Sequence, residues 1–445
     1  MTKIIPSPEG KRSSSHVLVI PFPASGHILP HLDLTNQLAL RGLTITVLVT
    51  PKNLHFVNPL VSLHPTTVQT LVLPFPNSHP SIIPPGVENM QDVTIEFMPC
   101  IATTLSGLHD PIVHWFQSHP CPPVAIFCDA LLNPWTHRFA SALGIKLIGF
   151  MPVNANFVFN CLDVQLDYDA YFKQVILKTK DNWGLVFNSF AELEKDKFDV
   201  IKAFMKHDRV WGLGPSIHIK AGLERSGGGP TDHKVMAWLD LCQLDKSVVY
   251  VGFGSQITLN KQQMEALGDA LEKSGVRFLW AVKDPVKGVK NEDDQSIVPA
   301  GFEDRVAGRG LVIRGWVPQA MILKHRAVGS YLSHCGWGSV LEGLIGGVLL
   351  LAWPMQCDHF LNTNMLVDDL GVAIRICEGL SIVPNTDVVA QILTESVNEN
   401  LPERIAFMKL RKKALNAIEE ASGGVFSAIG IFLLVAYDKY YISEY

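Results

Sequence analysis

The sequence predicts an α/β protein with two domains, each built on a parallel β-sheet covered by helices. Short apolar runs of strand length alternate with amphipathic helical segments, a pattern typical of parallel sheets. The chain has 445 residues, too many for one ordinary hydrophobic core and enough for two domains of about 200 residues each. Between 212 and 230, glycine, proline and charged residues replace the periodic pattern, which indicates a hinge between the domains.

The first strand is predicted at 17–20, and a turn ending in Gly26-His27 connects it to the first helix. His27 is therefore expected at the carboxyl end of the first sheet, where ligands of open α/β sheets bind. Its imidazole could take a proton from a phenol or an alcohol at neutral pH. A structural or solvated histidine is the ordinary alternative, since the chain has 16 histidines. Three leucines of the helix are predicted to face the core: Leu32, Leu38 and Leu40.

Asp129 follows the apolar run 124–128, which is another predicted strand of the first domain. A histidine base needs an acceptor for its second ring nitrogen, both to orient the ring and to stabilise the imidazolium. Asp129 is the candidate for this role beside His27. The alternative is that Asp129 only caps the helix that continues through Trp135.

The segment 316–359 contains a set of residues suited to a nucleotide-sugar site. Strands are predicted at 311–314 and 329–333, with a helix over 337–345 that begins directly after the second strand. The free N–H groups and the positive dipole end of that helix attract an anion such as phosphate. Four residues lie at this position, where glycines allow close backbone approach and the polar side chains can donate hydrogen bonds: His334, Gly336, Gly338 and Ser339.

Other residues near this helix suit the remaining parts of such a ligand. Glu342 lies one helical turn beyond Ser339 and could accept hydrogen bonds from two ribose hydroxyls, while Trp316 offers a flat face for uracil. Asp358 and His359 follow the apolar run 348–353 at the end of a third strand. Taken singly, each has an ordinary alternative, because tryptophans are usually buried and an Asp-His pair is usually a helix cap.

After the hinge, a strand and glycine turn over 247–255 would bring Ser255 towards the same diphosphate from the second domain. The complete set of residues resembles the signature of the plant family 1 UDP-sugar glycosyltransferases. That signature begins Trp-x-Pro-Gln, contains His-x-Gly-Trp-Asn-Ser and then Glu, and ends Trp-Pro-x-x-x-Asp/Glu-Gln. The resemblance implies a GT-B fold, in which two Rossmann-like domains face each other, with His27 as general base and Asp129 as its partner. It implies that the following residues bind the donor: Trp316, Val317, Gln319, His334, Trp337, Gly338, Ser339, Glu342, Asp358 and His359.

Two positions depart from the signature. Gly338 replaces its usual asparagine and His359 replaces its usual glutamine. Fewer polar partners on one side of the sugar would suit a 6-deoxy sugar such as rhamnose, although these residues alone do not choose between rhamnose, glucose and galactose. The segments 21–27, 48–53, 250–256, 336–339 and 358–360 also resemble the flavonol 7-O-rhamnosyltransferase branch of the family.

That resemblance implies inverting transfer of rhamnose from UDP-rhamnose to the 7-hydroxyl of a flavonol or a flavonol 3-O-glycoside. UDP-glucose or UDP-galactose as the donor is one alternative, and a non-catalytic protein that binds nucleotide sugars or flavonoids is another. No metal or other cofactor is expected, because the helix dipole, His334 and hydroxyl groups would meet the charge of the leaving UDP.

Composition restricts the other partners. The net charge is -5 and the charged residues are dispersed along the chain, so nothing suggests a nucleic-acid surface. Eight cysteines without a Cys-x-x-Cys pair are expected to be free thiols of a reducing compartment. The first apolar run is too short for a signal-peptide core, so a cytoplasmic protein is expected. We also expect it to be a monomer.

We predict an acceptor-binding domain over 1–235 and a UDP-sugar-binding domain over 236–424. The remaining segment, 425–445, is unusually apolar where the family has a polar helix. Its apolar run is too short to span a membrane, so no stable membrane insertion is expected.

Overall fold

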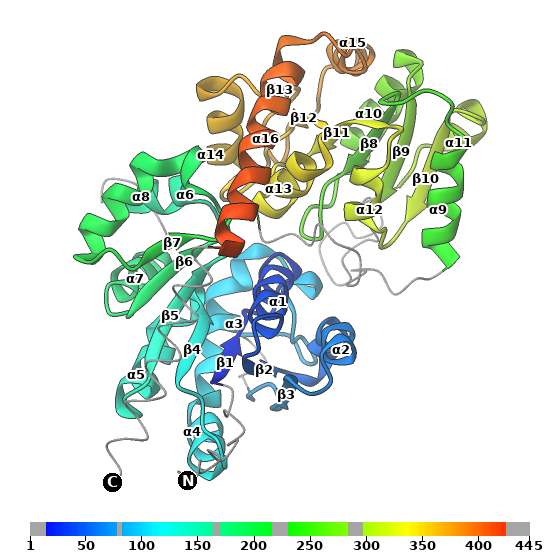
Figure 1. Ribbon diagram of the computed structural model, residues 1–445. Coiled ribbons are helices and arrows are strands. Elements are labelled where there is room, and N and C mark those ends of the chain that lie inside the picture. Colours follow the sequence, from blue (N-terminus) through cyan, green and yellow to red (C-terminus); the bar gives the residue numbers. More distant parts are fainter. Residues whose placement is uncertain (1–14, 78–81, 163–169, 216–229, 284–296, 424–445) are drawn as a thin grey trace, which may run out of the picture.

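The computed structural model describes residues 15–77, 82–162, 170–215, 230–283 and 297–423, and it contains two parallel β-sheets flanked by helices (Figure 1). The first sheet has the strand order β3-β2-β1-β4-β5-β6-β7, and the second has the order β10-β9-β8-β11-β12-β13. Every strand pair in both sheets is parallel. The predicted fold class of two Rossmann-like domains is therefore confirmed.

The strands of the first sheet are β1 His16–Ile20, β2 Thr44–Val49, β3 Val68–Val72, β4 Ala125–Asp129, β5 Lys146–Met151, β6 Gly184–Phe187 and β7 Val210–Gly212. The helices of this domain are α1 Ser25–Ala39, α2 Leu54–Leu63, α3 Met98–Thr104, α4 His109–Ser118, α5 Asn133–Ala142, α6 Ala155–Leu162, α7 Ala170–Thr179 and α8 Ala191–Met205. A short 3-10 helix, η5 Ala130–Leu132, precedes α5.

The strands of the second sheet are β8 Val248–Gly252, β9 Arg277–Val282, β10 Gly310–Arg314, β11 Val328–Ser333, β12 Leu349–Ala352 and β13 Ala373–Arg375. Its helices are α9 Pro230–Asp240, α10 Lys261–Ser274, α11 Phe302–Arg305, α12 Gln319–Lys324, α13 Trp337–Gly346, α14 His359–Asn364, α15 Thr386–Ser396 and α16 Pro402–Gly423. The strands and the helix predicted around the segment 316–359 correspond to β10, β11, β12 and α13.

Each sheet separates two hydrophobic cores because successive residues of a strand point to opposite faces. In β1, Leu18 and Ile20 pack into one core of the first domain, whereas Val17 and Val19 pack into the other. The second sheet repeats the pattern in β8, where alternate residues again enter different cores. Burial on both faces explains why these strands are continuous apolar runs in the sequence.

The strand orders place a change of direction between β1 and β4 in the first sheet and between β8 and β11 in the second. At such a point the chain leaves adjacent strands towards opposite sides, which opens a crevice at their carboxyl ends. His27 and Asp129 follow β1 and β4, and Ser255 and His334 follow β8 and β11. The topology thus brings together residues that are distant in the sequence.

Helix α16 packs on α13 of the second domain and also contacts α8 of the first (Figure 1). Ile418 of α16 lies against Gly214 of the first domain, where an added Cβ atom would be 3.4 Å from the Ile418 backbone. The predicted division after residue 235 falls inside α9 and stays a prediction. The apolar segment 425–445 lies outside the described residues.

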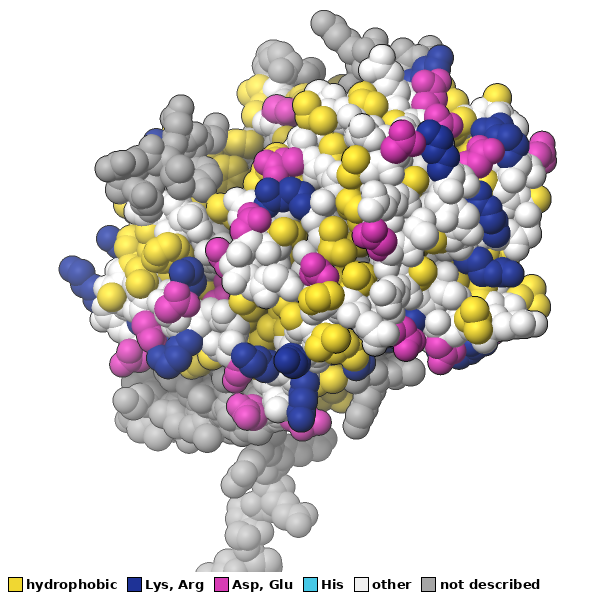
Figure 2. Space-filling model, turned by 90° about the horizontal axis from the view of Figure 1, so that it is seen from above, with side chains coloured by type: hydrophobic (Ala, Val, Ile, Leu, Met, Phe, Trp, Pro, Cys, Tyr) yellow, Lys and Arg dark blue, Asp and Glu magenta, His cyan; other side chains and the backbone are white. Residues whose placement is uncertain are grey.

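All eight cysteines are unpaired, as predicted. Within the described ranges, no helix combines the length and the apolar character needed to span a membrane. On the face seen in Figure 2, acidic and basic side chains are interspersed, and neither sign forms a continuous patch.

The prediction that Leu40 faces the core is wrong. Helix α1 ends at Ala39, and Leu40 follows as its C-cap residue with a relative exposure of 64%. The chain then turns through Gly42, whose φ of 83° favours glycine, and Leu43 becomes the next buried residue. Leu40 lies two residues after Leu38, and a helix turns such positions to nearly opposite sides, so the buried Leu38 leaves Leu40 towards solvent. Leu32 and Leu38 are buried as predicted.

Replacement of Leu38 and Leu40 by alanine should have different effects on stability. Leu38→Ala opens a cavity in the core and should lower the free energy of unfolding by about 2–5 kcal/mol. Leu40→Ala removes an exposed side chain and should change it by no more than about 0.5 kcal/mol. Calorimetric melting of both variants beside the wild-type chain would measure this, and equal losses would contradict the assignment.

Candidate active site

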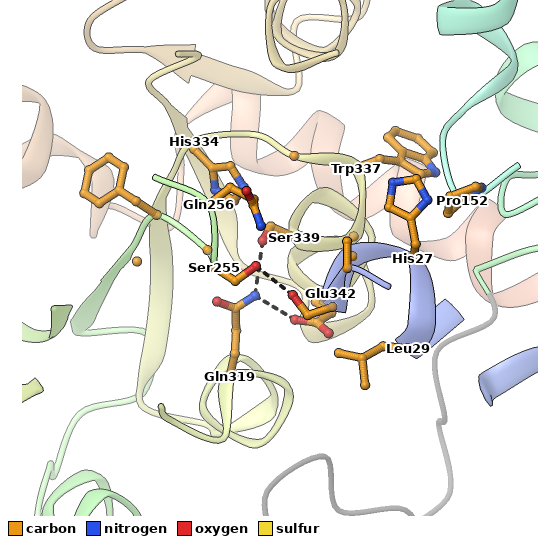
Figure 3. Close-up of a pocket in the computed structure, with 18 of the residues that line it drawn as sticks. His27, Leu29, Pro152, Ser255, Gln256, Gln319, His334, Trp337, Ser339 and Glu342 are labelled. Carbon is orange, nitrogen blue, oxygen red and sulfur yellow. Dashed lines mark hydrogen bonds between the residues drawn. The ribbon is translucent and has the colours of Figure 1, made fainter. Parts of the chain in front are cut away.

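A cavity of about 770 Å³ lies between the carboxyl ends of the two sheets, and residues of both domains line it. His27 enters it from α1, while Gln319, Ser339 and Glu342 come from α12 and α13 of the second domain (Figure 3). Every residue predicted to bind the donor lines this cavity. Asp129 lies behind His27 and is fully buried.

The His27 Nδ1 atom lies 2.8 Å from the Oδ2 atom of Asp129, so the predicted pair is in hydrogen-bond contact. An ionised carboxylate only accepts hydrogen bonds, and Nδ1 must therefore carry the ring proton. The lone pair of Nε2 is then available on a side chain that is 19% exposed. This arrangement gives His27 the geometry of a general base.

Asp129 also makes the capping contact that was its alternative assignment. Its Oδ1 atom accepts the Leu131 backbone N–H at 3.0 Å and caps η5, while Oδ2 serves His27. Burial alone would raise the pKa of this carboxyl, but the hydrogen bond and charge of His27, together with His31 and the Leu131 N–H, lower it below its usual value. Asp129 therefore remains ionised at neutral pH.

Gln319 is the centre of a hydrogen-bond network on the wall of the cavity that α12 and α13 form. The hydroxyls of Tyr250 and Tyr331 donate to its Oε1 atom at 3.2 and 3.0 Å. Its amide N–H groups therefore point the other way, towards Glu342 Oε2 at 2.7 Å and Ser339 Oγ at 3.2 Å. The two buried tyrosines fix the amide orientation, and the amide in turn holds the Glu342 carboxylate at the cavity wall.

His334 is held between two glycines. A Cβ atom on Gly254 or on Gly336 would lie 2.6 Å from the imidazole of His334, so neither position accepts a side chain without movement. Burial lowers the pKa of His334 well below its usual value, and the ring is neutral. Its Nδ1 atom and the amide nitrogen of Gln256 are buried without a hydrogen-bond partner among the described residues.

The N-terminus of α13 meets the cavity beside His334. Gly336 is its N-cap and supplies no side-chain hydrogen bond, while the Trp337 backbone N–H bonds to the Asp358 carboxyl. The N–H groups and the positive dipole end of this first turn suit an anion in the cavity. A Cβ atom at Gly338 would have no atom of the protein within 4 Å. The glycine in place of the usual asparagine therefore leaves open space at this helix end.

Asp358 and His359 follow β12, as predicted, and they lie at the start of α14, which was their ordinary alternative position. The Gln356 backbone N–H donates to His359 Nδ1 at 3.3 Å, so the proton of the neutral ring is on Nε2. Burial lowers the pKa of His359 to about 4. Near neutral pH the side chain of His359 is therefore a fixed N–H donor.

The other predicted residues differ in their surroundings. Trp316 is 50% exposed, which leaves a ring face free for stacking, whereas Val317 is also part of the hydrophobic core. Trp337 is buried, and its indole N–H donates to the Asn188 carbonyl of the first domain at 2.7 Å. Ser255 contacts Ser25 of the first domain, with 2.6 Å between the two hydroxyl oxygens.

Among the described residues, no group of three or more histidine, cysteine, aspartate or glutamate side chains is placed to hold a metal ion. The sequence does contain one Asp-x-Asp pair, Asp167 and Asp169, and both residues lie outside the described ranges. The expectation of a reaction without metal stays a prediction.

Residues 154–400 match the family model described as UDP-glucoronosyl and UDP-glucosyl transferase. The chain is 52% identical to a flavonol 7-O-rhamnosyltransferase of Arabidopsis thaliana over 413 residues, covering 91% of this chain and 94% of the relative. This chain belongs to the UDP-glycosyltransferase family. The predicted family is thus confirmed, and the protein is a UDP-glycosyltransferase.

Solved structures of similar proteins have the same fold as this enzyme over nearly its whole length. The crystal structure of Arabidopsis thaliana UGT89C1 complexed with UDP-L-rhamnose superposes with a TM-score of 0.86 at 49% identity, covering 94% of this chain and 99% of that one. A second structure of UGT89C1, complexed with quercetin, has a TM-score of 0.84 at 48% identity and covers 94% and 99%. The GT-B arrangement expected from the resemblance is confirmed.

Sequence reasoning missed several residues of the enzyme's cavity. Gln256 directly follows Ser255, and a polar side chain after a strand and a glycine turn was the signal that could have found it. Asn188 follows β6 at the same sheet edge and accepts from Trp337, but its role uses a backbone carbonyl, which no residue type reveals. Tyr250 is inside a strand, where the sequence gives no sign that its hydroxyl reaches Gln319.

Replacement of His27 by alanine should separate catalysis from UDP binding. Loss of the Nε2 lone pair should lower turnover by at least ~100-fold, the usual scale for a general base, while the affinity for UDP stays within about twofold. Steady-state kinetics and calorimetric titration with UDP would measure the two effects. His55→Ala, an exposed histidine outside the cavity, is the matched control and should retain full turnover. Equal losses of turnover and UDP affinity in His27→Ala would mean that His27 has a structural role.

Proposed function

We propose that this enzyme transfers rhamnose from UDP-rhamnose to the 7-hydroxyl of a flavonol or a flavonol 3-O-glycoside, with inversion at the anomeric carbon. The observation that carries the proposal is the hydrogen bond between His27 Nδ1 and Asp129. The Nε2 atom of the same His27 ring is left to face the cavity, which the α13 N-terminus and the Asp358-His359 pair also line. A base and a nucleotide-sugar site in one cavity are what such a transfer requires.

The reaction follows from this placement. UDP-sugar would bind mainly to the second domain, with uracil on Trp316, ribose at Glu342 and diphosphate at the α13 N-terminus, Ser255 and His334. The acceptor oxygen forms a bond to C1 of the sugar while the bond from C1 to the diphosphate breaks, and the acceptor proton moves to Nε2 of His27. Asp129 stabilises the imidazolium, and the N–H groups at α13 stabilise the charge on the leaving UDP.

The donor assignment depends on the sugar end of the site. Asp358 supplies an acceptor and His359 supplies one fixed N–H donor, whereas a glutamine in the same position would offer both a donor and an acceptor. Rhamnose has a methyl group where glucose has a hydroxymethyl, so it needs one polar partner fewer. The 52% identity to a flavonol 7-O-rhamnosyltransferase and the likeness to a protein solved with UDP-L-rhamnose support the same donor.

The acceptor assignment depends mainly on similarity, since UGT89C1 was also solved with quercetin. The wall of the cavity near His27 suits a flat aromatic molecule, because it is largely apolar. The residues that form it are Leu29, Pro30, Met90, Ile95, Met98 and Val153. We further propose that the enzyme acts in the cytosol as a monomer without a metal, and its unpaired cysteines suit a reducing compartment.

The first experiment is product formation from kaempferol and its 3-O-glucoside, with UDP-rhamnose, UDP-glucose and UDP-galactose supplied separately. Each reaction is run with and without EDTA, and the products are identified by mass and NMR. A 7-O-rhamnoside formed only from UDP-rhamnose, with or without EDTA, is the expected result. Hexosides would refute the donor assignment but keep the His27 mechanism, and bound ligands without any UDP release would indicate a non-catalytic binding protein.

Replacement of His359 by glutamine should change the choice of donor. The added amide offers both a donor and an acceptor to a sugar hydroxymethyl group, so the ratio of rhamnose to glucose transfer should fall by about tenfold, the effect of one hydrogen bond to a partly buried group. Competition between both donors in one reaction measures the ratio directly. An unchanged ratio would remove His359 from the selectivity argument, and Cys357→Ser, at an exposed neighbour, is a control for local disturbance.

A further inference from the structure

Two buried asparagines connect the domains directly behind the sugar end of the cavity. The side-chain nitrogen of Asn154, in the loop after β5, donates to Asn362 Oδ1 of α14 at 2.8 Å, and both residues have a relative exposure of 0%. The sequence predicted no role for either residue, and neither residue lines the cavity. A hydrogen bond between fully buried amides is well protected from competition with water.

The amide of Asn362 has its orientation fixed by three partners. Its nitrogen donates to Asp358 Oδ2 at 2.7 Å and to the Cys335 carbonyl at 2.9 Å, while its oxygen accepts from Asn154. A flipped amide would place its oxygen against two other acceptors, Asp358 and Cys335. The hydrogen bond that the Asn154 nitrogen donates therefore favours the one orientation of the Asn362 amide in which Asn362 also holds the Asp358 carboxylate.

Asn154 is itself fixed by the first domain. Its Oδ1 atom accepts the Phe157 N–H at 2.8 Å and caps helix α6, which directs its nitrogen across the interface. The carboxylate of Glu194 accepts the Ala155 and Asn156 N–H groups at 3.0 and 2.6 Å and also bonds to the hydroxyl of Ser189. The loop is thus held from behind by α8 before it meets the second domain.

We propose that Asn154 and Asn362 are positioning residues for the donor sugar, which transmit the relative placement of the two domains to the Asp358 carboxylate. The proposal rests on the proposed function in one respect, the assignment of Asp358 to the sugar. Its consequence is that sugar recognition depends on a residue of the first domain that touches no ligand. The nucleotide part of the donor, held by Trp316, Gln319 and Glu342, does not depend on this connection.

Electrostatics agrees with the geometry. Burial raises the pKa of Asp358, whereas the hydrogen bond from Asn362 opposes the rise. Loss of the Asn362 amide would remove this bond, which also holds the Asp358 side chain in place. The affinity for the sugar should then fall while the affinity for UDP remains.

The experiment compares the dissociation constants of UDP-rhamnose and UDP, measured by calorimetry without acceptor. Asn154→Ser keeps a side chain that can cap α6 but is too short to reach Asn362. It should lower the affinity for UDP-rhamnose relative to UDP by about fivefold, and Asn362→Ala should lower it by about tenfold, the scale of a hydrogen bond to a charged group. The double variant should match Asn362→Ala alone, because the two residues act in series.

Asn133→Ser is the matched control. Asn133 is equally buried in the first domain, and its amide on α5 donates to Thr179 of α7 at 3.0 Å, apart from the contact between Asn154 and Asn362. This control should lower the melting temperature without changing the ratio of the two dissociation constants. It separates a loss of stability from a loss of sugar positioning.

Two results would overturn the proposal. If neither dissociation constant changes in either variant, the asparagines only join the domains. If the affinities for UDP and UDP-rhamnose fall by the same factor, the asparagines hold the cavity as a whole. The same titrations with UDP-glucose distinguish this failure from a wrong donor assignment. A wild-type preference for UDP-glucose refutes the rhamnose assignment. The ratio of the dissociation constants of UDP-glucose and UDP in the variants then tests whether the asparagines position the sugar.

Discussion

Parallel strand pairing is the constraint on which the site of this glycosyltransferase depends. It places the carboxyl ends of all strands of a sheet at one edge, so loops that are more than 100 residues apart in the chain meet there. Two such edges face each other, and the cavity between them receives His27 from one domain and the N-terminus of α13 from the other. No single segment of the sequence contains the site.

The site contains histidines in opposite electrostatic surroundings. His27 lies against an ionised carboxylate, which stabilises the positive charge that it gains when it accepts a proton. His334 and His359 are buried beside each other, with ring centroids 4.6 Å apart at nearly perpendicular planes, and burial keeps both neutral. One residue type thus lies beside an ionised carboxylate in the first domain and is a neutral ring in the second.

The sequence was sufficient to predict the fold and part of the cavity lining. Strands buried on both faces are continuous apolar runs, and polar residues at their ends, such as His27, Asp129 and Asp358, can be located by position alone. The connections between these residues could not be predicted. The Asn154–Asn362 contact joins positions 208 apart, and it depends on how the domains dock, which no local pattern encodes. The Leu40 prediction failed for a different reason, since Leu40 lies two residues after the buried Leu38 and a helix turns such positions to nearly opposite sides.

The path of α16 has a consequence for how the cavity stays assembled between reaction cycles. The chain passes from the first domain to the second after β7, and α16 then brings it back into contact with α8 and Gly214. The covalent connection makes the docking of one domain on the other an intramolecular event with a high effective concentration. The contact of α16 with α8 and Gly214 adds a second connection outside the cavity lining. Separation of the two halves of the cavity would therefore have to break this contact as well.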